Sequence, residues 1–561
     1  MIIETIDQLR KLTQSDVQGN WVSTSEEISF DEINLDLWKP VELNDKGYII
    51  WTAGSQVKWL GQKFIIPHHL NDYPLSGLSL RLALVWWAKD AQIFVNNVLV
   101  QQGDLFDSSA RILLKSSVEP GEEILVILRL VSPGHDLGAL MKSKLIYEKN
   151  ANLNIENNAN NLGIDPGFVA DELTIIYNYF TAFEPKKIED FNQIINQINW
   201  DLASNTKQFN QNLIRLRKTL KPLSNKIKQG FFNLLGHAHL DMAWLWTVDE
   251  TWEIGQRTFS SVINLQKDFP ELIFGHTSPV LYAWIEKHNS ELFNNIKKAY
   301  KTGKWEILGG MWVEPEVNLV SGESLVRQLL YGQKYFQEKF GNITEVAWLP
   351  DSFGFCWQLP QILQQSGIKY FVTGKLHWNA TFKFAHGFFR WESPDGTQLL
   401  TFISPPNVEG VMDTNPIIMT NYAIEWQQQT GLKDAFWLPG VGDHGGGPSR
   451  DMLEVQNRWQ KSPFFPQSKF SKAIDYLNNI ADKIQNIPTW KDELYLDLHR
   501  GCYTTHGDQK WFNRRSEDLL YKAELWSSIA TIILEKKDSL KNKKLLEKAW
   551  KKVLFNQFHD I

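Results

Sequence analysis

Short apolar runs separated by turn residues mark the first part of the chain. They fall at 48–53, 63–67, 78–88, 91–100 and 123–131. Asn-Asn at 96–97 and Pro-Gly at 120–121 are dipeptides typical of hairpin turns. Short strands joined by such turns pair in antiparallel order, so residues 1–150 are predicted to form an N-terminal antiparallel β-sandwich domain.

The pattern changes after an Asn-rich stretch at 153–167, which is predicted to be a hinge. Residues 168–228 show apolar positions at helical spacing with many Lys and Gln between them. We therefore predict that 151–228 forms a helical linker.

From 231 to about 500, apolar runs end repeatedly in a polar or acidic cluster, and a helix-like segment follows each. These runs are 231–235, 272–275, 304–313, 345–350, 370–374 and 434–442. The alternation is typical of parallel strands in a β/α barrel or an open α/β sheet, where the carboxyl ends of the strands carry the chemistry. We assign 229–500 to such a domain and 501–561 to a helical bundle that is incomplete.

Composition narrows the function. A chain of 561 residues is too long for one hydrophobic core, and 43% hydrophobic with 22% charged residues is ordinary for globular domains. The net charge of −6 disfavours nucleic acid as a partner. Two cysteines and the absence of a signal peptide or a long apolar run favour a cytoplasmic protein without membrane spans. The 24 Trp residues indicate either large aromatic cores or carbohydrate binding, because an indole covers the apolar face of a sugar.

His239 and Asp241 come just after the run 231–235 and are two residues apart. In extended backbone their side chains point the same way, so they can occupy two positions around a divalent metal ion. The alternative is a pair of hydrogen-bonded loop residues. Trp244 and Trp246 follow directly and favour a sugar site.

Two carboxylates lie at the ends of other predicted strands. Asp351 is surrounded in sequence by aromatic residues, an environment that calls for a cation or a catalytic role, although a helix N-cap is the alternative. Asp443 lies in a Gly-rich loop at 440–450 that lacks the Lys-Ser/Thr ending of a phosphate-binding loop. Such a loop indicates close approach of the backbone to a ligand, or simple flexibility. Two carboxylates from different strand ends fit a glycosidase pair.

Six motifs resemble those of the α-mannosidases of glycoside hydrolase family 38, in the family's order and over about 231–561. They are GHAHLDMAWLW (236–246), GGMWVEPEVNLVSGESLVRQLLYG (309–332), WLPDSFGF (348–355), GVGDHGGGPSR (440–450), LHRGCYTTHGDQKWFNRRSE (498–517) and NQFHDI (556–561). The resemblance implies a distorted seven-stranded β/α barrel followed by a helical bundle.

The resemblance also implies a retaining exo-α-mannosidase that removes terminal α-linked mannose from glycans. One divalent metal, usually Zn²⁺, would be held by His239, Asp241, Asp351 and His559. Asp351 would be the nucleophile, Asp443 the acid/base and Trp244 the stacking residue. Further contacts with sugar hydroxyls are expected from Glu314, Lys375, Tyr503 and Asp560.

The sequence departs from the family at His444, where Gly is usual, and at Thr247, where Pro is common. It also stops two residues after His559, and because chain ends fray we expect this ligand to be poorly anchored. The sequence leaves open a homo-oligomer or a complementing C-terminal chain. Alternative functions are a metal-dependent polysaccharide deacetylase and a sugar-binding or inactive fragment.

Overall fold

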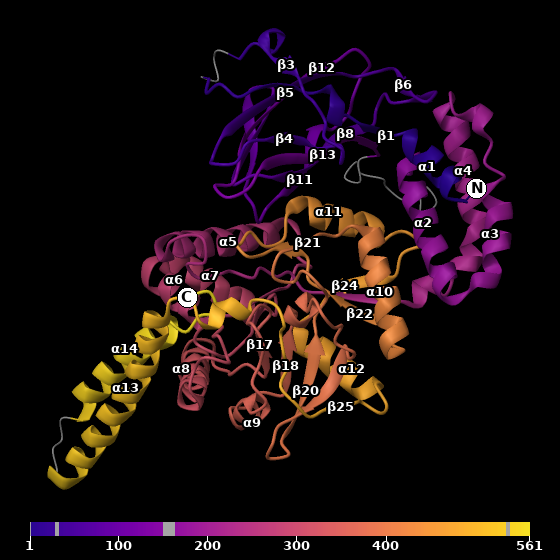
Figure 1. The fold of residues 1–561 in the computed structure, drawn as a ribbon. Helices are drawn as coiled ribbons and strands as arrows, with labels where there is room; N and C mark the ends of the chain where they lie inside the picture. Colours follow the sequence, from indigo (N-terminus) through magenta and orange to yellow (C-terminus); the bar gives the residue numbers. More distant parts are fainter. Residues whose placement is uncertain (1, 29–32, 150–162, 535–538) are drawn as a thin grey trace. The chain divides into compact units, whose positions relative to one another are not determined.

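A computed structural model describes residues 2–28, 33–149, 163–534 and 539–561, which form two compact units (Figure 1). The first unit holds 1–230 together with 415–424 and 454–467, and the second holds 231–414, 425–453 and 468–561. Most of the predicted hinge at 153–167 lies outside the described residues. The predicted domain boundaries stay predictions.

The first unit contains two large antiparallel sheets and a short antiparallel pair, β6 (His69–Leu70) with β7 (Tyr73–Pro74). One large sheet is built from β1 (Gln14–Asp16), β13 (Gly138–Glu148), β8 (Ser79–Trp87) and β11 (Ser109–Lys115), with β4 (Ile49–Trp51) also pairing with β13. The other has the order β10 (Val98–Gly103), β9 (Asp90–Val95), β12 (Glu123–Val131), β5 (Val57–Ile65), β2 (Val22–Thr24) and β3 (Lys39–Pro40). Each predicted run of the N-terminal part overlaps at least one of these strands, and the run 91–100 overlaps both β9 and β10.

Local sequence explains these sheets. Along β8, every second side chain is buried, which is the pattern of a strand with one face in a core. Asn96 and Asn97 join β9 to β10 with φ of 46° and 67°, the left-handed backbone that a two-residue hairpin turn requires. The predicted hairpin at this pair is confirmed.

Helices complete the first unit. They are α1 (Ile2–Lys11), α2 (Pro166–Phe183), α3 (Ile188–Ile195) and α4 (Thr206–Leu220). Asp165 caps α2 by accepting a hydrogen bond from the Phe168 N–H, and a proline follows at the first helical position. A buried ion pair between Glu172 and Arg217, with N···O distances of 2.7 and 2.8 Å, joins α2 to α4. The expected helical segment after the sheets is therefore present.

Parallel strand pairs form the centre of the second unit. They are β14 (Phe231–Leu234) with β22 (Asp434–Trp437), β15 (Phe274–His276) with β16 (Trp305–Ile307), and β17 (Val346–Trp348) with β18 (Tyr370–Thr373) and β20 (Gln398–Ile403). The neighbouring strands are β24 (Gln467–Phe470), β19 (Phe388–Glu392), β25 (Thr489–Trp490) and the short pair β21 (Val411–Met412) and β23 (Gly440–Val441). Each of the six apolar runs predicted to be a parallel strand overlaps one of the parallel strands. Closure into a seven-stranded barrel stays a prediction.

Helices follow these strands along the chain. They are α5 (Val248–Asp268), α6 (Pro279–His288), α7 (Ser290–Lys301), α8 (Gly322–Phe340), α9 (Leu359–Gln365), α12 (Ala473–Lys483), α13 (Gly507–Leu534) and α14 (Ser539–Phe555). Two more, α10 (Pro416–Thr430) and α11 (Arg450–Trp459), have residues in both units. In the predicted bundle region, α13 and α14 lie side by side (Figure 1). Among the described residues, no helix combines the length and the apolar character needed to cross a membrane.

Candidate metal centre and active site

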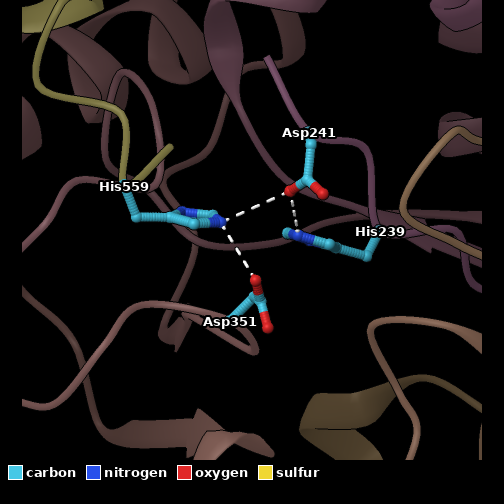
Figure 2. Close-up of side chains that lie close together, drawn as sticks. All are labelled: His239, Asp241, Asp351 and His559. Atoms are coloured by element: carbon cyan, nitrogen blue, oxygen red, sulfur yellow. Dashed lines mark hydrogen bonds and ion pairs between the residues drawn. The ribbon is translucent and has the colours of Figure 1, made fainter. Parts of the chain in front are cut away.

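Four side chains from three distant segments meet in the second unit. His239 and Asp241 lie in the loop after β14, Asp351 follows β17, and His559 follows α14 (Figure 2). The first three follow the carboxyl ends of the parallel strands β14 and β17, and such strand ends are where this kind of fold places reactive side chains. The structure thus brings together the four residues that the sequence singles out as metal ligands.

The four side chains are close enough to share one ion. His239 Nε2 lies 2.7 Å from Asp241 Oδ1, and His559 Nε2 lies 3.3 Å from both Asp241 Oδ1 and Asp351 Oδ2 (Figure 2). One ligand atom from each residue lies within 4.8 Å of all the others, and all four residues are buried. Ligands of a tetrahedral zinc ion are separated by about 3.4 Å.

His559 is firmly anchored, so the expectation of a poorly anchored ligand is wrong. Its backbone N–H and its Nδ1 both lie within hydrogen-bond distance of the Glu314 carbonyl oxygen, at 3.2 and 3.0 Å. Trp550, Leu554 and Phe558, on α14 and just after it, are at most 1% exposed and belong to the core of the second unit. The packing of these apolar side chains holds the segment that ends in His559.

The donor set fits a divalent transition metal. Since Nδ1 of His559 faces a carbonyl oxygen, Nε2 is left with its lone pair toward the two carboxylates. This nitrogen is buried and has no hydrogen-bond partner within the described parts of the chain. A cation between two imidazoles and two carboxylates satisfies all four groups, and this mixture of ligands is typical of Zn²⁺ sites.

Glu314 lies behind the histidines and does not line the cavity described below. One of its carboxylate oxygens accepts a hydrogen bond from the Thr277 hydroxyl, and the other lies 3.4 Å from His239 Nδ1. Burial lowers the pKa of His239, but the charges of Asp241 and Glu314 outweigh burial and raise it to about 10. A carboxylate placed on the far nitrogen of a metal-binding histidine orients the ring. This position differs from that expected of a contact with sugar.

A cavity of about 230 Å³ adjoins the four-residue cluster. The expected site residues that line it are Asp241, Trp244, Asp351, Lys375, Asp443, Tyr503, His559 and Asp560. Trp244 is 43% exposed, so its indole is accessible to a ligand. The Tyr503 hydroxyl donates to the carbonyl of Phe353, which fixes the phenol at the cavity wall.

Asp351 and Asp443 have opposite protonation preferences. Burial raises the pKa of Asp351, but the nearby His559 imidazole, 3.3 Å from Oδ2, and the charge of Lys375, whose Nζ lies 2.5 Å from Oδ1, outweigh burial and lower the pKa. Burial raises the pKa of Asp443 well above its usual range, and the charge of Asp241 adds to this. The surroundings therefore favour the ionised form of one carboxyl and the protonated form of the other in the same cavity, the opposite shifts that a nucleophile and a general acid need.

Local backbone places Asp443. Its φ of 52° is left-handed, and its carbonyl oxygen accepts a hydrogen bond from the Asp241 N–H at 2.9 Å. His444, a departure from the family pattern, packs against Trp246 with ring centroids 4.3 Å apart and does not line the cavity. Thr247, the other departure, caps α5 by accepting a hydrogen bond from the Glu250 N–H.

Sequence reasoning did not single out several cavity residues. Glu409, Glu316, Trp378 and His499 line the cavity beside the expected residues. None of them carried a recognisable spacing. The aromatic and acidic character of the strand-end loops was the signal that could have found Trp378 and Glu409.

Comparison with known proteins identifies the family. Residues 231–493 match the glycosyl hydrolases family 38 N-terminal domain, and residues 497–561 match the alpha mannosidase middle domain. Alpha-mannosidase G of Dictyostelium discoideum is 34% identical over 66% of this chain and 33% of its own length. Human alpha-mannosidase 2C1 is 35% identical over 58% of this chain and 31% of its own length.

The fold agrees with these matches. The crystal structure of an alpha-mannosidase from Enterococcus faecalis V583 superposes with a TM-score of 0.51 at 20% identity, covering 59% of this chain and 38% of that one. The chain spans about a third of the length of the two curated relatives. The chain therefore belongs to glycosyl hydrolase family 38, of which it carries the N-terminal and middle domains.

Proposed function

We propose that the chain is a metal-dependent retaining exo-α-mannosidase that removes terminal α-linked mannose from glycans. One observation carries the proposal: a buried His/Asp/Asp/His cluster adjoins a cavity lined by Asp351 and Asp443, whose pKa values are shifted in opposite directions. The relatives are named alpha-mannosidases, which supports mannose as the sugar. Cytoplasmic location remains a prediction from the sequence.

His239, Asp241, Asp351 and His559 would hold the metal, for which we propose Zn²⁺ because of the mixed nitrogen and oxygen donors. When bound, the ion would supply a Lewis acid that binds and polarises sugar hydroxyl oxygens beside Asp351. Glu314 would orient the His239 ring through Nδ1. Trp244 would stack on the sugar face, and Lys375 would hold the Asp351 carboxylate in its ionised form.

The chemistry would run in two steps. In the first, an oxygen of Asp351 attacks C1 of mannose, the bond from C1 to the glycosidic oxygen breaks, and Asp443 gives its proton to that oxygen. In the second, the Asp443 carboxylate takes a proton from water while the water oxygen attacks C1. This step breaks the ester to Asp351 and restores the starting configuration at C1 and both carboxyl groups.

Replacing Asp351 by Asn tests the assignment. The amide is a poor nucleophile and a weaker ligand, so turnover of an aryl α-mannoside should fall below detection while the far-ultraviolet circular dichroism spectrum stays native. Asp497→Asn is the matched control, because the Asp497 carboxylate accepts hydrogen bonds from the Ala380 and Thr381 N–H groups and the Thr381 hydroxyl and does not line the cavity. Hydrolysis by Asp351→Asn at the wild-type rate would remove Asp351 as nucleophile, and release of acetate from acetylated sugars would favour a deacetylase.

The relatives extend well beyond the matched region, so a complementing C-terminal polypeptide or self-association remains part of the proposal. Exposed apolar side chains on α13 support it: Trp511, Trp526, Ile532 and Ile533 are between 61% and 78% exposed. A chain that binds mannose but does not hydrolyse it would favour the sugar-binding alternative.

A further inference from the structure

Glu409 stands out among the cavity residues because one of its two carboxylate oxygens makes no hydrogen bond to the described residues. It lies between β20 and β21, is 3% exposed and lines the cavity. One oxygen, Oε1, accepts a hydrogen bond from the Trp378 indole N–H. The other, Oε2, is buried and has no hydrogen-bond partner among the residues that the structure describes. Leaving such an atom unpaired costs about 1–3 kcal/mol.

Two glycines, Gly442 and Gly374, let the backbone pack closely against the Glu409 segment on either side. A Cβ on Gly442 would lie only 1.9 Å from the Glu409 carbonyl oxygen, and the Gly442 N–H donates to the Gly410 carbonyl at 2.9 Å. Glycine at 442 therefore lets the Glu409 segment lie directly against the loop that ends in Asp443. On the other side, a Cβ on Gly374 would lie 2.5 Å from Val408 and 3.4 Å from Glu409 Oε2.

The surroundings of Glu409 belong to the reacting centre. Its partner Trp378 packs under the Lys375 ammonium, which lies 4.3 Å from the ring centroid and pairs with Asp351. Trp378 is 42% exposed, so it offers the cavity an indole surface. A carboxylate oxygen beside an aromatic surface is the pairing that binds a sugar, since the carboxylate accepts from a hydroxyl and the ring covers the C–H face.

The charges around the cavity favour an uncharged hydrogen-bond donor as the partner of Glu409 Oε2. The cavity is already lined by several carboxylates, among them Asp351, Asp443 and Asp560, against the cations of Lys375 and Lys510. An anionic ligand would be repelled, whereas a hydroxyl group brings a proton without charge. Resting on the proposed function, we propose that Glu409 is a specificity-determining residue whose Oε2 accepts a hydrogen bond from one hydroxyl of the sugar held beside Asp351.

Glu316 provides a matched control. It is also a buried glutamate that lines the cavity, but both of its oxygens are occupied, one by the Phe353 N–H at 3.0 Å and the other by the Asn318 N–H at 3.2 Å. Glu316→Gln therefore changes the same chemical group in the same cavity without removing a free acceptor.

The test measures binding rather than turnover. Metal-loaded wild type, Glu409→Ala and Glu316→Gln are titrated with methyl α-mannoside and with the derivatives that each lack one hydroxyl. We expect one derivative to bind wild type and Glu316→Gln about 5- to 150-fold more weakly than the parent sugar. In Glu409→Ala that ratio should fall to about 1, while the ratios for the other derivatives stay unchanged.

Unchanged ratios in Glu409→Ala for every derivative would overturn the assignment, as would a wild type that binds none of the sugars. If Glu409→Ala does not fold, Glu409→Gln replaces it: its amide oxygen still serves Trp378 but its nitrogen cannot accept, so the discrimination should fall at least about 5-fold. An unchanged ratio there overturns the assignment equally. Hydrolysis of an aryl mannoside is measured in parallel, so that position-specific binding without hydrolysis contradicts the mannosidase proposal and leaves Glu409 standing.

Discussion

Asp443→Asn gives the sharpest view of the acid/base assignment. The left-handed φ of 52° at this position is tolerated by Asn but strained for Ala, so Asn removes the acid while keeping the loop. The Asp443 carbonyl that accepts from the Asp241 N–H is retained as well. Any loss of rate then reports the missing proton and not a collapsed loop.

The size of the loss should depend on the leaving group. General acid catalysis contributes about 10²- to 10⁴-fold, equivalent to about 3–5 kcal/mol of transition-state stabilisation. We expect a loss of that size in kcat/KM for methyl α-mannoside, whose leaving oxygen must be protonated. For 4-nitrophenyl α-mannoside the loss in the first step should be smaller than about 10-fold, because nitrophenolate leaves without a proton.

The pH profile gives a second reading of the same variant. Since Asp443 must carry its proton, wild-type kcat/KM should fall as the pH rises through the raised pKa of this carboxyl. The variant should lack that basic limb and keep the acidic limb set by ionisation of Asp351. Equal losses on both substrates with an unchanged basic limb would refute Asp443 as the acid.

Four variants test metal binding and stability. His559→Ala should abolish stoichiometric zinc binding, and Glu314→Gln should weaken zinc binding about 10- to 100-fold. Competition with a chelator measures both affinities. Unchanged affinity in both variants would contradict His559 as a ligand and Glu314 as the residue that orients His239. Lys375→Met leaves the Asp351 carboxylate buried without its cation, so the unfolding free energy of the metal-free protein should fall by about 3–5 kcal/mol in urea titrations, and an unchanged midpoint would argue against the pair. A buried carboxyl with a raised pKa lowers the unfolding free energy as the pH rises above about 3.9, the usual pKa of an unfolded Asp. Metal-free Asp443→Asn should therefore be more stable than wild type at neutral pH. A lower unfolding free energy for the variant would contradict the raised pKa of Asp443.

Local patterns were sufficient for the elements and for the positions of the reactive residues along them. Apolar runs such as 78–88 predicted strands such as β8, and Asn96–Asn97 predicted the hairpin, because both features are set by neighbouring residues. The strand-end position of Asp351 followed from the same periodicity. These inferences need no knowledge of how distant segments pack.

Long-range geometry explains how His559 is anchored and where Glu314 and Glu409 lie, which the sequence alone did not predict. His559 comes within bonding distance of Glu314, 245 positions earlier in the chain, only because α14 packs its apolar residues into the core. The position of Glu314 behind the histidines, rather than in the cavity, depends on that packing. Glu409 owes its place to contacts with Gly374 and Gly442, which no local pattern announces.

Hydrolysis of 4-nitrophenyl α-mannoside by the purified 561-residue chain, stripped of metal and then titrated with zinc, tests the central claim most directly. The account predicts no release of nitrophenol from the stripped protein and a rate that saturates at one zinc per chain, since the buried cluster offers one set of four ligands. Stoichiometric zinc binding without any release of nitrophenol would contradict it.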